Sequence, residues 1–131
     1  MIVMVLGGGG AKAAAHVGAV QALEEAGLAP GHLLGTSMGG VFAALFAAGL
    51  SAREALDRVA GIGEREIVRT EPFAFLKGLW ATSLLKPAPF RRALERMIGV
   101  RRFEDLRLPL TITATALDTG ELALFGAGGR S

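Results

Sequence analysis

The sequence predicts an α/β domain in which helices cover a mainly parallel sheet. Short apolar runs that contain β-branched residues alternate with helical patterns, and this order is typical of such sheets. Two glycine-rich turns, at residues 7–10 and 35–39, each lie between a predicted strand and a predicted helix. The 131 residues are 51% hydrophobic, which is enough for one domain with a core and excludes an intrinsically disordered chain.

The first half of the chain predicts two strands and two helices. Residues 2–6 are apolar throughout, so we expect a buried strand at the centre of the sheet. A helix is predicted over 13–26 with Gly27 as its C-terminal stop, followed by a short strand over 32–34. The helix predicted over 38–48 is apolar on every face and therefore belongs inside the fold.

Two further helices are predicted after residue 50. Ser51 and Glu54 have the spacing of a capping box and should begin a helix that ends near Gly61. Residues 90–98 carry apolar side chains at helical spacing, and Gly99 follows them as a stop signal. The second of these helices is amphipathic.

The end of the chain predicts a β-hairpin. Strands are expected over 110–117 and 121–125, joined by a turn at 118–120. Because the sequence stops directly after this hairpin, we expect residues 1–131 to be the N-terminal portion of a single domain that is truncated at its C-terminus. The strand edge left uncovered there should pair with another chain, which predicts an oligomer.

Composition excludes several classes of function. The chain has no cysteine and two histidines, so neither a disulfide framework nor a metal site is expected. A net charge of +2, without aromatic residues interleaved in the way that single-strand nucleic-acid binders require, gives no support for a nucleic-acid partner. The longest apolar stretch has 13 residues, against the roughly 20 of a membrane span. No signal peptide is recognisable, and we expect a cytoplasmic protein.

Two stretches leave their interpretation open. Residues 86–107 carry seven basic and three acidic side chains, which form either a solvated helix face or a patch for anionic lipid headgroups. Residues 73–90 are rich in aromatic and aliphatic side chains. These side chains either pack in the core or form a lid beside Ser37. A lid of this kind would also contact a membrane surface.

Residues 35–39 have the pattern Gly-x-Ser-x-Gly between a strand and a helix. A serine on such a sharp turn exposes its hydroxyl, and Gly35 and Gly39 leave room for the strained backbone. The helix that follows directs its positive dipole end toward this position. Ser37 is therefore the candidate nucleophile, and the alternative is a serine that only caps the helix.

The glycine loop at residues 7–10 can direct backbone N–H groups at a negative charge. An oxyanion hole is one interpretation. A dinucleotide fingerprint at Gly8, Gly10 and Ala13 is another, although no acidic residue follows about 20 positions later. A P-loop is excluded because Lys12 is followed by Ala13 without the required glycine spacing.

No histidine follows Ser37, so the usual order of a Ser-His-Asp hydrolase is excluded. His16 lies inside the first helix, where a packed or hydrogen-bonded role is expected. His32 is expected in the turn before the second strand. The serine would need a base of another kind.

The sequence resembles the patatin-like phospholipases, bacterial members in particular, over nearly its entire length. The matching stretches are Gly8–Gly18, Ala22–Gly27 and Gly35–Gly40, with weaker likeness at Phe103–Leu106, Pro109 and Thr119–Glu121. The resemblance implies a Ser–Asp dyad, with Ser37 as nucleophile and an oxyanion hole at Gly8, Gly9 and Gly10. Lys12 matches the basic residue after the loop, whereas Ala13 stands where a glycine is common.

The dyad aspartate of this family lies in an Asp-Gly-Gly or Asp-Gly-Ala motif, which the sequence lacks. Asp118 is followed by Thr119 and belongs to the predicted hairpin turn, so it is not assigned as the base. The resemblance thus implies a serine acyl hydrolase acting on lipid or ester substrates, and a chain that is inactive alone. The alternative is a non-catalytic module that binds a phosphate or nucleotide with the glycine loop.

Overall fold

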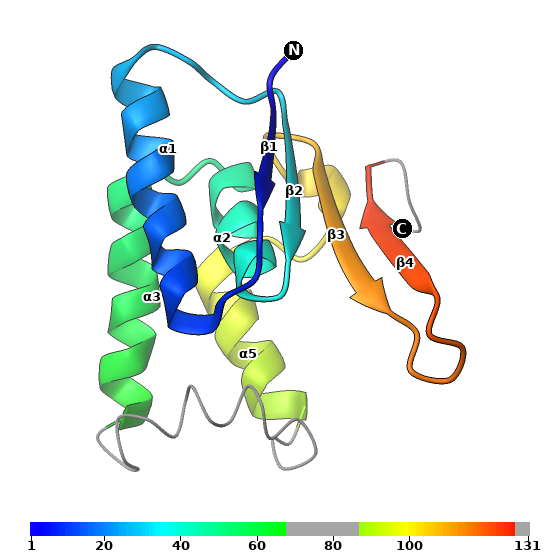
Figure 1. The fold of residues 1–131 in the computed structure, drawn as a ribbon. Coiled ribbons are helices and arrows are strands. Elements are labelled where there is room, and N and C mark those ends of the chain that lie inside the picture. Colours follow the sequence, from blue (N-terminus) through cyan, green and yellow to red (C-terminus); the bar gives the residue numbers. More distant parts are fainter. Residues whose placement is uncertain (68–86, 128–131) are drawn as a thin grey trace.

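Four strands form one sheet in the computed structural model, which describes residues 1–67 and 87–127 (Figure 1). They are β1 (Val3–Leu6), β2 (His32–Thr36), β3 (Leu110–Thr115) and β4 (Leu122–Gly126), in this spatial order. The pairs β1–β2 and β2–β3 are parallel, and β3–β4 is the antiparallel hairpin. The predicted mainly parallel sheet and its terminal hairpin are confirmed.

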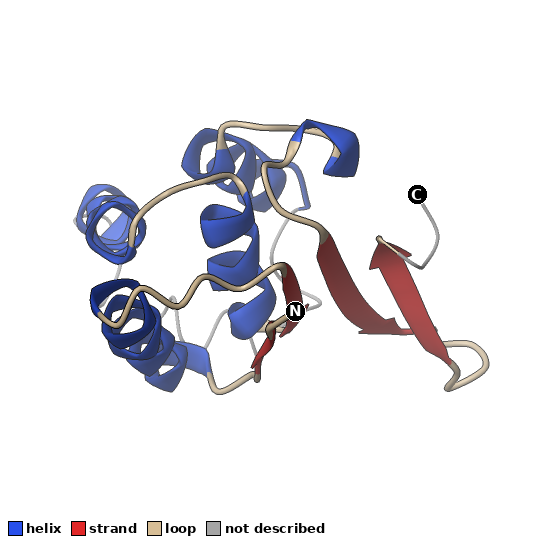
Figure 2. Ribbon diagram, turned by 90° about the horizontal axis from the view of Figure 1, so that it is seen from above, coloured by secondary structure: helices blue, strands red, loops and turns tan. Residues whose placement is uncertain are grey.

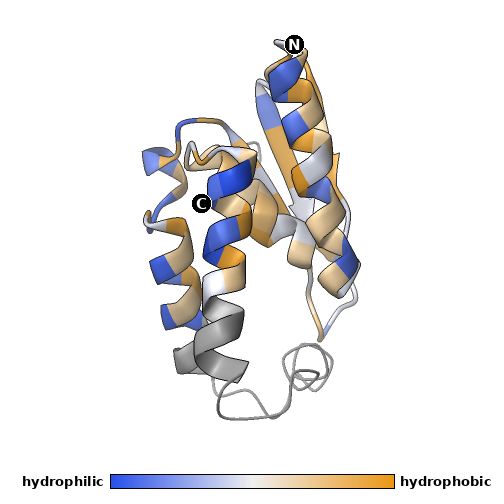
Figure 3. Cartoon of the chain, turned by 90° about the vertical axis from the view of Figure 1, so that its left-hand side faces the viewer, coloured by the Kyte–Doolittle hydropathy of each residue, from blue (hydrophilic) through white to orange (hydrophobic). Residues whose placement is uncertain are grey.

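The helices gather on one side of this sheet when it is seen from above (Figure 2). They are the 3-10 turn η1 (Gly10–Ala14), α1 (Ala15–Glu25), α2 (Met38–Ala47), α3 (Ala52–Ile67), α5 (Pro87–Ile98) and the 3-10 turn η2 (Phe103–Asp105). Apart from the apolar α2, the helices carry both hydrophilic and hydrophobic residues along their length (Figure 3). None of the described helices has both the length and the apolar character that a membrane span needs.

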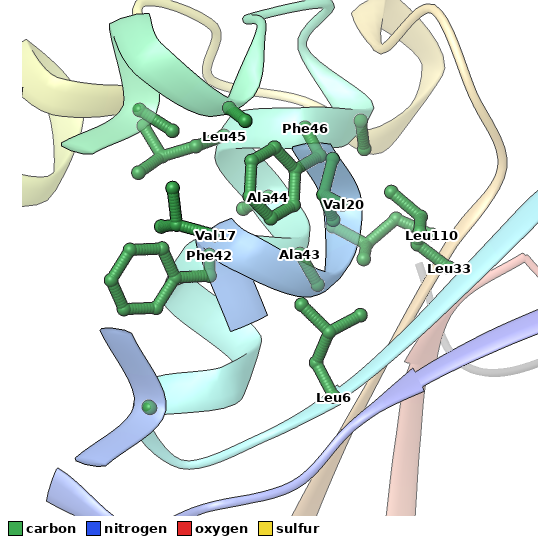
Figure 4. Packing of buried hydrophobic residues seen from close by; sticks show 14 of the residues in the cluster. Leu6, Val17, Val20, Leu33, Phe42, Ala43, Ala44, Leu45, Phe46 and Leu110 are labelled. Carbon is green, nitrogen blue, oxygen red and sulfur yellow. The ribbon is translucent and has the colours of Figure 1, made fainter. Parts of the chain in front are cut away.

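The core lies between α2 and the sheet. Every residue of α2 except Val41 is buried, which confirms that this all-apolar helix belongs inside the fold. Leu6, Leu33 and Leu110 come from three neighbouring strands and are almost completely buried against it (Figure 4). The α2 helix therefore fixes the loops at the carboxyl ends of β1 and β2 relative to each other.

The first strand lies at the edge of the described sheet, so its predicted central position is wrong. Val3 and Val5 are 50% and 64% exposed, while Leu6 on the helix-covered face is fully buried. A continuous apolar run indicates a strand but does not show whether both faces are covered. Among residues 1–67 and 87–127, only one face of β1 is covered.

Most helix ends agree with the prediction. Gly27 and Gly99 have φ values of 69° and 79°, the left-handed conformation that ends a helix. The α3 helix, however, continues to Ile67, past the predicted end at Gly61. A side chain at Gly61 would meet nothing within 4 Å, so this glycine lies on an open helix surface and does not break the helix. The first α-helix, α1, begins at Ala15, slightly after the predicted start at 13, and the 3-10 turn η1 precedes it from Gly10.

Candidate active site

Ser37 lies on the turn between β2 and α2, in a conformation that a side chain rarely adopts. Its φ is 54° and its ψ is −130°, and it is the one non-glycine residue with positive φ in the described part of the chain. Such a backbone costs about 1–3 kcal/mol and persists where the surrounding packing enforces it. Ser37 is exposed, and its hydroxyl makes no capping hydrogen bond to α2. A capping role therefore does not explain this serine.

The two glycines of the Gly-x-Ser-x-Gly pattern let the turn approach its neighbours. A Cβ atom at Gly35 would lie 2.5 Å from the Gly40 Cα, which is closer than real contacts allow. A Cβ atom at Gly39 would collide with the carbonyl oxygens of Leu6 and Gly7. The predicted need for space at Gly35 and Gly39 is confirmed, and both arise from backbone-to-backbone packing.

The glycine loop passes directly beside Ser37. A Cβ atom at Gly8 would be 3.1 Å from Ser37 Cβ and 3.8 Å from Ser37 Oγ. Gly9 and Gly10 have φ values of 153° and 57°, which favour glycine. The loop then enters η1, where the Lys12 N–H donates to the Gly9 carbonyl at 3.1 Å and the Lys12 side chain is exposed. The fold thus brings Gly8 to Ser37, while Lys12 remains at the surface.

The two histidines lie in different parts of the fold. His16 Nε2 is 2.9 Å from the Gly7 carbonyl oxygen, so His16 is hydrogen-bonded to the glycine loop. His32 Nε2 lies 2.9 Å from Thr111 Oγ1, which itself donates to the Ala127 carbonyl at 2.7 Å. His32 is the first residue of β2, at the end of the strand opposite to Ser37. The strand predicted over 32–34 thus begins at His32 as expected, and the placement of His32 in the preceding turn is wrong.

An apolar cavity of about 460 Å³ opens beside Ser37, and this volume is typical of small-molecule sites. The α2 helix, α5, the segment around η2 and β3 contribute its walls. Its lining residues are Ser37, Met38, Gly40, Val41, Ala44, Leu94, Ile98, Val100, Arg101, Arg102, Phe103, Leu106, Leu110 and Ile112. No pattern in the sequence predicted this cavity, although Leu94 and Ile98 have the i, i+4 spacing of one helix face. The lid predicted over 73–90 lies mostly outside the described residues.

Arg101 and Arg102 line this cavity, and both residues are exposed. Arg102 Nε donates to Glu104 Oε2 at 3.0 Å. This hydrogen bond raises the pKa of Arg102 and lowers the pKa of the Glu104 carboxyl. Arg101 is 3.9 Å from a carboxylate oxygen of Glu95, a longer contact between side chains that are 80% and 30% exposed. The cavity therefore combines apolar walls with two arginines, each of which lies near a glutamate.

Asp118 belongs to the turn of the β3–β4 hairpin, as predicted. Its Oδ1 atom accepts a hydrogen bond from the Thr119 N–H at 3.0 Å, and the residue is exposed. The hairpin projects away from the helices (Figure 1). The carboxylate thus has a local role in the turn.

Comparison with known proteins gives a consistent family. The model of the family described as patatin-like phospholipase matches residues 4–127. Patatin-like phospholipase domain-containing protein 6 of Homo sapiens is 36% identical over 121 residues, which are 88% of this chain and 9% of that protein. An NTE family protein of Mycobacterium tuberculosis is 32% identical over 97% of this chain and 34% of its own length. The chain thus spans about a third of one of these relatives and about a tenth of the other.

A solved structure also resembles this chain. The type III effector protein ExoU has 23% sequence identity and a TM-score of 0.52, covering 98% of this chain and 36% of the effector. At this identity the likeness concerns the fold. It extends over nearly the whole of this chain, so the same fold also occurs as part of a longer protein.

Proposed function

Because the chain belongs to the patatin-like phospholipase family, we propose that it carries the nucleophile and the oxyanion-binding loop of a serine acyl hydrolase acting on lipid esters. The observation that carries this proposal is the conformation of Ser37. Its φ of 54° presents an exposed hydroxyl beside Gly8 and at an apolar cavity. A structural serine would not need this strained backbone.

The proposed first step is acylation of Ser37. Its Oγ attacks the ester carbonyl carbon, the hydroxyl proton passes to a carboxylate base, and the carbonyl oxygen becomes an oxyanion. Backbone N–H groups of the Gly8–Gly10 loop and the N-terminus of α2 would stabilise that charge. The C–O bond then breaks, and the alcohol leaves with the proton. Water releases the acid and restores Ser37.

The cavity supports a lipid acyl chain as the group held beside Ser37. Its walls are mainly aliphatic side chains from α2, α5 and β3, which exclude water from an alkyl chain. Arg101 and Arg102 would face a negatively charged headgroup at the cavity, or the anionic surface of a membrane. Peripheral contact with a lipid surface is therefore part of the proposal.

The test uses the full product of the gene that encodes this chain. Ser37→Ala is expected to abolish hydrolysis of p-nitrophenyl esters and labelling by an alkyl fluorophosphonate, with an unchanged thermal unfolding midpoint. Ser51→Ala, which removes a serine at the start of α3, should retain both activities. Turnover that survives Ser37→Ala would reject the proposed nucleophile. Stabilisation of the protein by nucleotides, without labelling, would support the phosphate-binding alternative instead.

A further inference from the structure

His16 connects the first turn of α1 to the glycine loop, nine residues earlier in the chain. Its Nε2 atom lies 2.9 Å from the Gly7 carbonyl oxygen, and its ring is half-buried. A carbonyl oxygen has no proton to give, so Nε2 must carry the hydrogen and donate it. The contact therefore defines the tautomer: in the neutral ring the hydrogen is on Nε2 and not on Nδ1.

This hydrogen bond fixes a peptide group that adjoins Ser37. The described peptide bonds are all trans, so the C=O of Gly7 and the N–H of Gly8 point in opposite directions from one rigid plane. When His16 holds the Gly7 oxygen, it also holds the direction of the Gly8 N–H, which then points away from the imidazole. A Cβ atom at Gly8 would lie 3.1 Å from Ser37 Cβ, so this plane is next to the proposed nucleophile.

The loop needs such a constraint because four consecutive glycines have little conformational preference of their own. Gly39 at the start of α2 supplies a second restraint, since its α-carbon packs against the same Gly7 oxygen. Gly39 limits how far the Gly7 carbonyl can move toward α2, and His16 provides the hydrogen bond that selects its direction. An oxyanion site requires N–H groups that are already oriented before charge develops.

We infer that His16 is a positioning residue that orients the Gly7–Gly8 peptide so that the Gly8 N–H is directed to the oxyanion. The inference rests on the proposed function of Ser37 and adds a role for a residue outside the reacting groups. His16 acts through the loop and takes no proton from Ser37. A side chain that donates a hydrogen bond at the same reach can therefore replace it.

Three variants of the full gene product test this role. His16→Gln keeps an N–H donor at the same number of bonds from the backbone, whereas His16→Met has a similar length and no donor. His32→Gln is the matched control, because His32 is bonded to Thr111 away from Ser37. The measurements are kcat and KM for a p-nitrophenyl ester, and the saturating rate of fluorophosphonate labelling.

We expect His16→Met to lower kcat and the saturating labelling rate about 10- to 100-fold, with KM little changed. This loss is smaller than the 10²- to 10³-fold typical when an oxyanion donor is removed outright, because the Gly8 N–H remains but loses its direction. His16→Gln should stay within about 3-fold of the wild type, since one neutral donor replaces another. His32→Gln should match the wild type in both measurements.

Two kinetic outcomes overturn the inference and leave the proposed function intact. Both require that Ser37→Ala is inactive. In one, His16→Met retains full kcat. In the other, His16→Gln and His16→Met lose activity equally, as they would if the imidazole accepted a proton. If Ser37→Ala retains activity, the proposed function fails and this inference fails with it. Nitrogen-15 NMR of the wild type gives a readout that needs no activity: the Nε2–H tautomer of His16 supports the inference, and the Nδ1–H tautomer overturns it.

Discussion

Several positions near Ser37 are glycines, and little or no space is left there for a side chain. Gly35 and Gly39 each border another backbone segment at a distance that leaves no room for a methyl group, whereas a methyl group at Gly8 would meet the Ser37 side chain at 3.1 Å. Gly39 is the most constrained, because its missing Cβ faces two carbonyl oxygens at the end of β1. Backbone cannot move aside as the end of a flexible side chain can. The strained turn at Ser37 therefore depends on contacts between main-chain atoms of three segments.

Gly39→Ala is expected to destabilise the protein by about 1–3 kcal/mol or more, the usual cost of overpacking. Gly18→Ala is the matched control, because Gly18 also lies within a helix but has open space around its Cα. There the same methyl group should stabilise the protein by about 0.5–1 kcal/mol through helix propensity. Urea unfolding midpoints measure both changes. Equal effects of the two substitutions would show that Gly39 is not packed against β1.

At the scale of secondary-structure elements, side chains form hydrogen bonds at the start of α3 and at the end of α5. The Ser51 N–H and hydroxyl both donate to Glu54 Oε2 at 2.8 Å, and the Glu54 N–H donates back to Ser51 Oγ at 3.3 Å. This arrangement confirms the predicted capping box. Arg58 Nη1 of α3 donates to the Met97 carbonyl at 2.6 Å, near the end of α5. Through Arg58, α3 is therefore bonded to the end of α5, and α5 forms one wall of the cavity.

The capping box gives α3 a dependence on pH. The hydrogen bonds from the Ser51 backbone and then its hydroxyl lower the pKa of Glu54 from its ordinary value of 4.5. A lowered pKa in the folded state contributes stability that is present above the unfolded pKa and is lost as pH falls through the folded value. Glu54→Gln should therefore destabilise the protein at pH 7, and the difference from wild type should shrink below about pH 4.5.

Urea unfolding at pH 7 and at pH 3 measures this difference. Ser51→Ala should cost about 1 kcal/mol at pH 7, and less when Glu54→Gln is already present, because the two side chains share one capping box. Additive effects of the two substitutions would contradict the reciprocal bond. So would an equal effect of Glu54→Gln at both pH values.

At the scale of the whole molecule, one face of the sheet carries the helices and the site lies at one end of it. Local pattern was sufficient for much of this arrangement: the turn at Ser37, the room at Gly35 and Gly39, the capping box and the hairpin. Features that depend on distant segments were not predictable. The edge position of β1 depends on which strands pair with it, and the bond of His16 to Gly7 depends on how the loop folds back. The cavity depends on α5 meeting α2.

The last prediction concerns the 131-residue chain as a hydrolase by itself. Its sequence has no Asp-Gly-Gly or Asp-Gly-Ala motif, so the base implied by its family is not assigned to any of its residues. General-base catalysis contributes about 10²- to 10⁴-fold, and loss of one member of a nucleophile–base unit costs nearly as much as loss of the unit. The isolated chain should therefore turn over p-nitrophenyl esters no faster than its own Ser37→Ala variant.

The assay uses protein that is monodisperse by size-exclusion chromatography, because the β4 edge is also expected to pair with other chains. Turnover that disappears in both Ser37→Ala and Asp118→Asn would identify Asp118 as the base. Turnover that disappears in Ser37→Ala alone would place a different proton acceptor within these 131 residues.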